Sequence, residues 1–334
     1  MKVDVIYAGR PKDGTMNGIL RQAINMINGL MEAGVDVTPI PIKKIEPRIF
    51  GKPVGGWLSQ RIFLQTLRRT DADIVHSVSL WMISPNTDIV HAHDIFPLMY
   101  ADHFGLTNTT KRFYKRILNQ AKNVNRVIVE SNVVKESLVE RGFDGNKIVK
   151  ITTKVPQPEN IGPNPYKDDG KIHLFTLGEF GKRKRFGVLY EYMQSFQEAE
   201  LYHIGRVVYK NYYEECMKFK PPNVHYLGYK PEAEMRGYMK YADAFVYNTL
   251  NEGQGFAPME AMRLNVKTIV NDLPVFRELL GDKAYYYNDV DGFIRAVCDK
   301  PKKTGLVEQI AQYDDEIEKT IKLYKEVLVE EEMK

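Results

Sequence analysis

The chain is poor in cysteine and has no long hydrophobic run. Its 334 residues include two cysteines, Cys216 and Cys298, which lie far apart and outside any Cys-x-x-Cys spacing. This excludes a disulfide framework and a zinc cluster. A membrane-spanning helix needs about 18 consecutive apolar residues, and the sequence contains no such run. The first residues alternate like a strand and do not resemble a signal peptide, so we expect a cytoplasmic protein whose membrane contacts are peripheral.

Two familiar ligand signatures are also missing. The glycines between Gly9 and Gly14 lack the Gly-x-Gly-x-x-Gly spacing, and no phosphate-binding P-loop is present. Of the two Asp-x-Asp triplets, 71–73 precedes its expected strand, whereas a metal-binding pair should follow one. Asp289 in the other triplet is better explained as a helix N-cap. We therefore expect neither a metal nor a cofactor.

What is present is an ordinary globular composition. Lys and Arg number 47 against 43 Asp and Glu, a net charge of +4, with 43% hydrophobic and 27% charged residues. These values argue against disorder. At one domain per roughly 100 to 200 residues, the length predicts two domains.

Strand patterns alternate with helical patterns along the chain, which predicts an α/β fold with mostly parallel, doubly wound sheets. The expected strands are 3–8, 35–40, 73–78, 88–93, 126–130, 172–177, 199–204, 223–227, 244–247 and 268–270. Four prolines between residues 156 and 165 cannot sustain a helix or a central strand. We therefore expect domains at 1–155 and 171–305 facing a cleft, a linker at 156–170, and a C-terminal helix within 306–334 that packs back on the first domain.

Positive charge gathers in the first half, where residues 1–150 hold 21 Lys and Arg against 14 Asp and Glu. Its densest part reads as an amphipathic helix with a cationic face, formed by Lys111, Arg112, Lys115, Arg116, Lys122 and Arg126. Two interpretations stay open: the face is simply solvated, or it binds an anionic acceptor or an anionic lipid surface.

The most informative stretch is NEGQGFAPMEAM at residues 251–262. Gly253 and Gly255 let a ligand approach the main chain. A glycine loop that leads into a helix presents free N–H groups and the positive end of the helix dipole, so the pattern predicts a phosphate site. Glu252 in the loop and Glu260 in the helix would bind different parts of one ligand, and carboxylates suit the hydroxyls of a sugar or ribose.

This stretch resembles the Glu-x7-Glu signature of retaining glycosyltransferases with the GT-B fold, in particular family 4 (glycosyl transferases group 1). The resemblance spans roughly residues 171–290 and includes the flanking blocks 223–229, 241–246 and 271–279. It implies that Glu252 holds hydroxyls of the transferred sugar and that Glu260 holds the ribose of a nucleotide-diphosphate sugar. The main chain around Gly255, Phe256 and Ala257 would hold sugar and diphosphate.

A basic loop, GEFGKRKRFG, starts at Gly178 where a strand is expected to end. Fixed positive charge at such a place can stabilise a departing diphosphate. The family has an Arg or Lys pair in this loop, and Arg183 and Lys184 match the pair best by spacing, although Glu179 stands where many members have arginine. The alternative is a solvated basic turn.

The first domain resembles the family less closely. Gly18 matches one glycine of the pair that opens the family's first helix, while Asn17 departs from it. Residues 89–97 are similar to the family's strand ending in His-Asp, which implies that His93, beside Asp94, touches the donor sugar or the acceptor hydroxyl. The alternative is a structural histidine. His91 lies on the same side of the strand by two-residue alternation, so its contribution stays open.

The resemblance implies a hexosyltransferase that moves sugar from a nucleotide-diphosphate sugar to a hydroxyl acceptor with retention of configuration. The acceptor would be a glycan, glycolipid or small molecule, anionic or lipid-linked acceptors included, and no nucleic acid is expected as a partner. The donor's base would meet main-chain groups near Tyr229. We favour front-side attack, in which the leaving phosphate accepts the proton. Two alternatives stay open: a nucleotide-sugar epimerase of the same fold, and an inactive nucleotide-sugar-binding subunit of a partner transferase.

Overall fold

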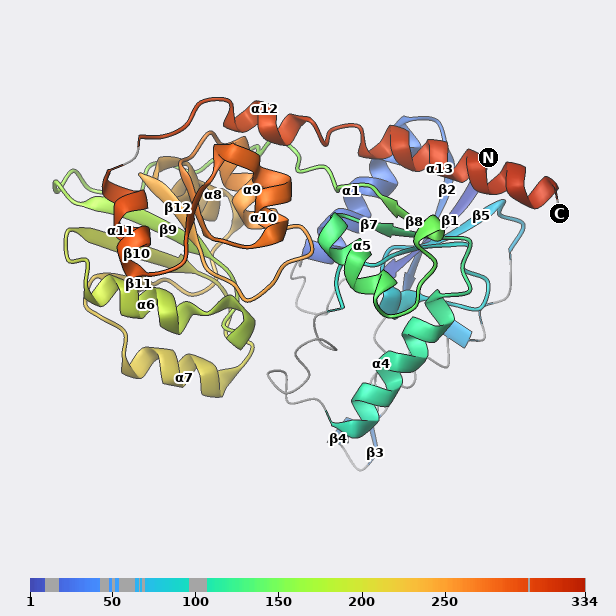
Figure 1. The fold of residues 1–334 in the computed structure, drawn as a ribbon, viewed down its shortest axis with the longest axis horizontal. Coiled ribbons are helices and arrows are strands. Elements are labelled where there is room, and N and C mark those ends of the chain that lie inside the picture. Colours follow the sequence, from blue (N-terminus) through green and yellow to red (C-terminus); the bar gives the residue numbers. More distant parts are fainter. Residues whose placement is uncertain are drawn as a thin grey trace. The chain divides into compact units, whose positions relative to one another are not determined.

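A computed structural model describes residues 1–9, 18–42, 48–49, 52–53, 64–65, 67, 70–95, 107–299 and 301–333. The expected loop between Gly9 and Gly14, apart from Gly9 itself, lies outside the described residues, as do Asn17 and residues 96–97. The described chain forms two six-stranded sheets and one small two-stranded sheet (Figure 1). The small sheet pairs β3 (Arg48–Ile49) with β4 (Lys52–Pro53).

The first large sheet has the strand order β2-β1-β5-β6-β7-β8, and all its pairs are parallel. Its strands are β1 (Lys2–Ala8), β2 (Asp36–Ile42), β5 (Ile74–Ser77), β6 (Ile89–His91), β7 (Arg126–Val129) and β8 (Ile148–Lys150). Parallel strands need crossover connections, and here these run through α1 (Gly18–Glu32), η1 (Leu80–Met82), α4 (Asn108–Ala121), α5 (Asn132–Val139) and η2 (Gly145–Lys147).

Helices cover both faces of the first sheet. On one face α1 packs beside α13 (Glu316–Glu332), drawn in red in Figure 1, over the strand residues Val3, Ile74 and Ile89. Apolar residues of α1 recur at three- and four-residue spacing, which is what turns one side of a helix toward a core. On the other face α4 and α5 bury apolar residues against β6 and β7.

The second large sheet is also parallel and has the order β11-β10-β9-β12-β13-β14. Its strands are β9 (Ile172–Leu177), β10 (Ala199–Ile204), β11 (Val224–Tyr226), β12 (Ala244–Tyr247), β13 (Thr268–Asn271) and β14 (Tyr285–Tyr287). The strand order reverses between β9 and β12. In doubly wound sheets ligands bind at the carboxyl ends of the strands at such a switch point.

One face of this sheet packs against α6 (Phe186–Gln194) and α11 (Val290–Cys298) in a core that is rich in aromatic rings. On the other face Phe175 of β9 stacks on Tyr238 of α8 (Glu232–Tyr241). The remaining helices are η3 (Lys182–Lys184), α7 (Lys210–Lys218), α9 (Phe256–Arg263), α10 (Pro274–Leu280), η4 (Gly281–Lys283) and α12 (Leu306–Ala311).

The chain divides into two compact units. The first contains residues 1–153 and 315–334, and the second contains residues 154–314. Helix α13 therefore belongs to the first unit and α12 to the second. The proline-rich segment expected as a linker lies in the second unit, where Tyr166 donates its hydroxyl to the Tyr238 carbonyl at 2.6 Å and stacks on His173. The prolines exclude regular structure there, but they leave the segment free to pack in an extended form.

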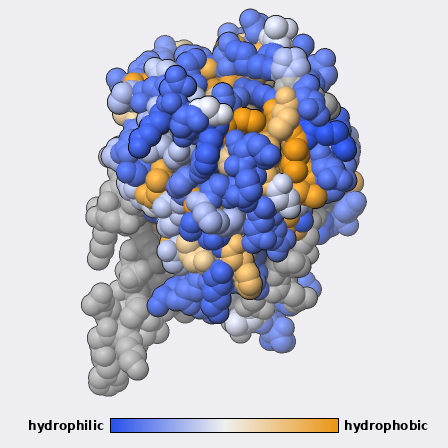
Figure 2. Space-filling view, turned by 90° about the vertical axis from the view of Figure 1, so that its left-hand side faces the viewer, coloured by the Kyte–Doolittle hydropathy of each residue, from blue (hydrophilic) through white to orange (hydrophobic). Residues whose placement is uncertain are grey.

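No helix in the described parts of the chain combines the length and the apolar character that crossing a bilayer requires. The face drawn in Figure 2 is mostly hydrophilic, with hydrophobic residues gathered in separate small patches. Scattered apolar residues of this kind are normal on protein surfaces and do not by themselves mark a binding site.

Candidate functional site

The loops after β9 and β12 meet at the switch point of the second sheet. The backbone N–H of Leu250, after β12, donates to the carbonyl oxygen of Arg183, after β9, at 2.7 Å. Thr249 Oγ1 lies 3.2 Å from the same oxygen. These contacts bring the basic loop and the glutamate loop together, although 60 or more residues separate them in sequence.

Glu252 and the two expected cations form one cluster. Glu252 Oε1 accepts hydrogen bonds from Arg183 Nη1 at 2.6 Å and from Lys184 Nζ at 2.8 Å. Tyr247 donates its hydroxyl to the same oxygen at 3.0 Å, and Thr249 Oγ1 lies 3.2 Å from it. The side-chain bonds that described residues make to this carboxylate all end on Oε1, so within the described part of the chain the other oxygen is available as an acceptor for a ligand hydroxyl.

The charges of this cluster shift one another's ionisation. Burial works against the Glu252 carboxylate, but Arg183 and Lys184 outweigh it and lower the pKa of Glu252 to about 2. Burial and the nearby charge of Arg183 lower the pKa of Lys184 to about 8, against the opposing pull of Glu252. Burial and the Glu252 charge raise the pKa of Tyr247 well above its ordinary value, so this phenol is neutral.

Tyr247 and Thr249 are site residues that the sequence analysis missed. The Lys184 ammonium donates to the Tyr247 hydroxyl and lies 4.7 Å from the centre of the tyrosine ring. Tyr247 therefore contacts both Lys184 and Glu252. It ends an ordinary buried strand, so its pattern in the sequence signals only a core residue.

The glycine loop leads into α9 as predicted. Gly255 has a φ of 83°, and a side chain there would meet the ring of Phe276, 2.5 Å from the position of a β-carbon. The N-cap residue Gly255 has no side chain that could cap this helix start, where Phe256 and Ala257 are half-buried. The first N–H groups of α9 thus have the anion-binding character expected of a helix N-terminus. Glu260 is half-buried on α9, and Gly253 is buried in the loop.

Gly178 is held at the end of β9 by a close backbone contact. A side chain on Gly205 would lie 1.7 Å from the Gly178 carbonyl oxygen, so glycine is required where these two loops touch. His203 Nε2 also hydrogen-bonds that oxygen at 2.9 Å. Tyr229 follows β11 with 60% of its surface exposed.

In the first unit His93 is occupied by protein partners. Its Nε2 lies 2.6 Å from the Val78 carbonyl oxygen, and its Nδ1 hydrogen-bonds the carboxylate of Glu130, a residue that the sequence analysis missed. His91 stacks on His93 and is buried, so the two do lie on one side. Asp94 follows, half-buried, and Gly18 is exposed at the start of α1. Both ring nitrogens of His93 are thus bound by protein groups, and its contact with a donor sugar or an acceptor hydroxyl stays a prediction.

The two Asp-x-Asp triplets have structural partners. Asp71 pairs with Lys2 Nζ at 2.6 Å, and Asp73 accepts the Lys2 backbone N–H at 2.8 Å. Asp289 accepts the Gly292 N–H at 2.7 Å, which confirms the predicted N-cap of α11. Among the residues with described positions, no three His, Cys, Asp or Glu side chains group in a way that could hold a metal ion.

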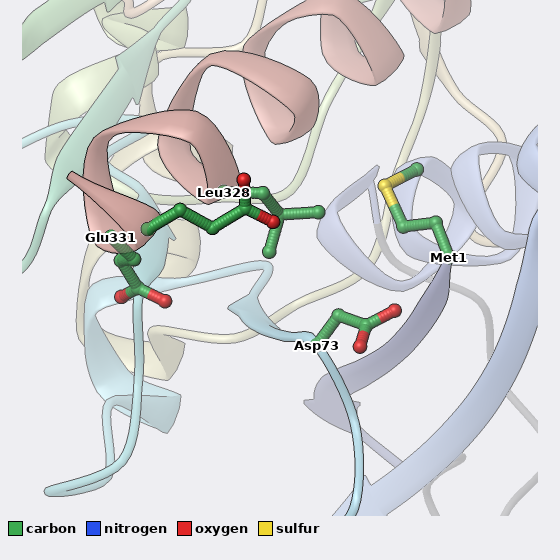
Figure 3. Close-up of a pocket in the computed structure, with 5 residues that line it drawn as sticks. Met1, Asp73, Leu328 and Glu331 are labelled. Atoms are coloured by element: carbon green, nitrogen blue, oxygen red, sulfur yellow. The ribbon is translucent and has the colours of Figure 1, made fainter.

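A pocket lies at the edge of the first sheet where its strands begin, opposite the edge that carries His93. Met1 and Asp73 line it from the sheet, and Leu328 and Glu331 line it from α13, together with Glu332 (Figure 3). Ligands of doubly wound sheets bind at the carboxyl ends of the strands, so this pocket is not the candidate site.

Two family models together match most of the chain. The model described as Glycosyl transferases group 1 matches residues 158–325, and the one described as Glycosyltransferase Family 4 matches residues 16–155. The chain is 26% identical over 211 residues to the O-antigen chain mannosyltransferase RfbU of Salmonella typhimurium, which covers 60% of this chain and 57% of that relative. It is 22% identical over 324 residues to alpha-monoglucosyldiacylglycerol synthase of Acholeplasma laidlawii, which covers 80% of each.

Solved structures share the fold along almost the whole chain. Sucrose-phosphate synthase from Thermosynechococcus elongatus superposes with a TM-score of 0.74 at 13% identity, covering 98% of this chain and 99% of that one. HepE of Anabaena, in complex with UDP and glucose, superposes with a TM-score of 0.68 at 11% identity, covering 98% and 100%. The predicted α/β fold of the GT-B type is confirmed.

Proposed function

This chain belongs to the glycosyl transferases group 1, and we propose that it moves a hexose from a nucleotide-diphosphate sugar to a hydroxyl acceptor with retention of configuration. The observation that carries the proposal is the cluster of Arg183, Lys184 and Glu252 at the switch point of the second sheet. It places two cations and a carboxylate on loops at the edge where a doubly wound sheet binds its ligand.

Each part of the cluster has a role in donor binding. Arg183 and Lys184 stabilise the negative charge of the departing diphosphate, together with the N–H groups at the start of α9. Glu252 uses its second oxygen to accept a sugar hydroxyl, and Glu260 binds the ribose. The nucleobase meets the main chain near Tyr229. The complex of HepE with UDP and glucose supports a donor of this class.

In the transfer step the acceptor oxygen bonds to the anomeric carbon on the face from which the phosphate departs. The bond between this carbon and the phosphate oxygen breaks, and the acceptor proton passes to that oxygen. Because Arg183 and Lys184 supply the positive charge, no metal is required. We expect a metal chelator to leave the rate unchanged.

The names of the two curated relatives bear on the acceptor. One is an O-antigen chain mannosyltransferase and the other makes a glucosylated diacylglycerol. We infer that the acceptor of this chain is a glycan or glycolipid, reached through peripheral membrane contact of the basic helix α4.

The test starts with a thermal-shift panel of nucleotide diphosphates, since a ligand that binds only the folded chain raises its melting temperature. Transfer is then measured for Glu252→Ala and Lys184→Ala, which are expected to lose about 100-fold or more in rate. Lys182→Ala is the matched control, because Lys182 is an exposed lysine in the same loop. Wild-type rates for either site variant would remove the proposed site. A new sugar formed from donor alone would indicate an epimerase, and binding without turnover would indicate an inactive subunit.

A further inference from the structure

Three histidines of the first sheet form a row of stacked rings. His76 lies on β5, His91 ends β6, and His93 follows two residues later on the same side. The ring centres of His76 and His91 are 5.0 Å apart, and those of His91 and His93 are 5.4 Å apart with nearly parallel planes. His76 and His91 are fully buried, whereas the side chain of His93 is 15% exposed at the carboxyl edge of the sheet.

The partners of His93 decide its protonation state. Its Nε2 faces the carbonyl oxygen of Val78, and its Nδ1 faces the carboxylate of Glu130. A carbonyl oxygen and an ionised carboxylate can only accept hydrogen bonds. Both ring nitrogens must therefore carry hydrogen, which makes His93 a positively charged imidazolium.

The other two rings are arranged to stay neutral. His76 Nε2 lies 3.0 Å from His91 Nδ1, and this bond needs one N–H and one lone pair, so the two rings cannot both be charged. At the far end His76 Nδ1 bonds the hydroxyl of Tyr324 on α13 at 2.6 Å. Burial lowers the pKa of His76 to about 3, and burial with the neighbouring rings lowers the pKa of His91 well below its usual value.

Glu130 is the reason that His93 is charged while His76 and His91 are neutral. This glutamate follows β7 and is 2% exposed. Gln22 of α1 donates to its Oε1 at 3.3 Å, the same oxygen that His93 binds. Burial opposes both charges of the pair. Their mutual attraction nevertheless raises the pKa of His93 and lowers that of Glu130, and the nearby charge of Asp94 raises the pKa of His93 further.

We propose that His93 acts in glycosyl transfer as a fixed cation and not as a base, and that Glu130 is the positioning residue that holds it in this state. The inference rests on the proposed transferase function. Neither ring nitrogen has a lone pair to offer, so His93 does not take the acceptor proton, which passes to the leaving phosphate oxygen. The ring of His93 instead keeps one orientation and one charge state at this edge, because both of its N–H groups are bound by protein oxygens.

The direct test is NMR titration of the whole chain with ¹⁵N-labelled histidine, with His93→Gln used to assign the signal. We expect both nitrogens of His93 to remain protonated at pH 7 and to titrate above the ordinary value of 6.5. His76 and His91 should stay neutral over the same range. A neutral His93 at pH 7 would overturn the proposal, and this measurement needs no variant of Glu130.

The second test is Glu130→Gln, which keeps the size of the side chain and removes its charge. The titration of His93 should move to lower pH, and kcat should fall at least about tenfold with a smaller change in the donor KM. Glu140→Gln is the matched control, since Glu140 is an exposed glutamate of the same unit. An unchanged kcat together with an unchanged His93 titration would refute the role of Glu130. A chain that transfers no sugar from any donor contradicts the proposed function, while the titration still decides the state of His93.

Discussion

At the scale of single residues, the candidate site depends on one carboxylate oxygen. Glu252 Oε1 binds Arg183, Lys184 and Tyr247, so a buried negative charge offsets part of the positive charge of the two cations. Leaving such charges unpaired in a buried place would cost several kcal/mol, roughly 3 to 5 when one partner is removed. Glu252 thus holds the two cations in position, where we propose that they bind a diphosphate.

The lowered pKa of Lys184 predicts that donor binding depends on pH. At a pKa of about 8 the side chain is a cation below pH 8 and becomes neutral as the pH rises through this value. A phosphate group binds the ammonium form, so affinity for a nucleoside diphosphate should fall about tenfold for each pH unit well above 8. Calorimetry between pH 7.5 and 9.5 measures this.

Lys184→Arg is the control for this pH effect, since arginine stays charged throughout the range. Its affinity should change little with pH. A wild-type affinity that is flat up to pH 9.5, or an equal alkaline loss in the arginine variant, would show that Lys184 is not the group responsible.

The residues that the sequence analysis identified and those that it missed differ in a physical way. Glu252, Arg183 and Lys184 stand in loops whose glycines and charges mark them. Tyr247 ends a strand and Glu130 directly follows one, and the patterns of these strands indicate only buried structure. The contacts of both side chains come from partners more than 30 residues away or from the fold of the next loop. Such pairings are set by sheet order, which no local pattern contains.

At the scale of elements, all ten predicted strands are present, and their boundaries differ from the prediction by two residues at most. The strands that were missed in the large sheets are β8 and β14, each of three residues at a sheet edge. An edge strand this short has one neighbour and too few residues to show an alternating pattern. The basic helix was expected near 111–126 and is found at Asn108–Ala121, where Thr107 caps its start through the Thr110 N–H.

Helix α4 exposes positively charged side chains to solvent. Ile117, Leu118 and Ala121 are buried against the sheet, whereas Arg112, Lys115 and Arg116 are exposed. We expect these three cations to bind vesicles that contain anionic lipid, with roughly 1 kcal/mol for each charge near the surface. Replacing all three with glutamine should abolish most of the sedimentation with such vesicles at low salt.

The control for α4 replaces Lys210, Lys218 and Lys322, which are exposed lysines on other helices and give the same change in net charge. This variant should sediment like the wild type. Equal losses in both variants would show that only net charge matters, and binding to neutral vesicles at high salt would contradict an electrostatic contact.

At the scale of the whole molecule, the chain passes between its two units twice, at residues 153–154 and 314–315. Arg263 contacts a residue next to each of these two crossing points. Its Nε donates to the Val155 carbonyl at 2.8 Å, and its guanidinium pairs with Asp314. Arg263 is buried at the end of α9, whose beginning forms the expected diphosphate site.

We therefore expect Arg263→Ala to destabilise the second unit by about 2 to 3 kcal/mol, because it leaves buried hydrogen-bonding groups without partners. Urea unfolding measures the change, and Arg295→Ala on the exposed side of α11 is the control. Equal stability of the two variants would show that the contacts of Arg263 contribute little.

The division of the chain also has a consequence for its synthesis. The second unit is complete once residue 314 has left the ribosome, whereas the first sheet still lacks α13, whose Leu323, Tyr324 and Val327 fill its core. Domains generally fold as units while the chain is being made. Here the half that is translated first is therefore finished second, and until then part of its apolar face is exposed to chaperones.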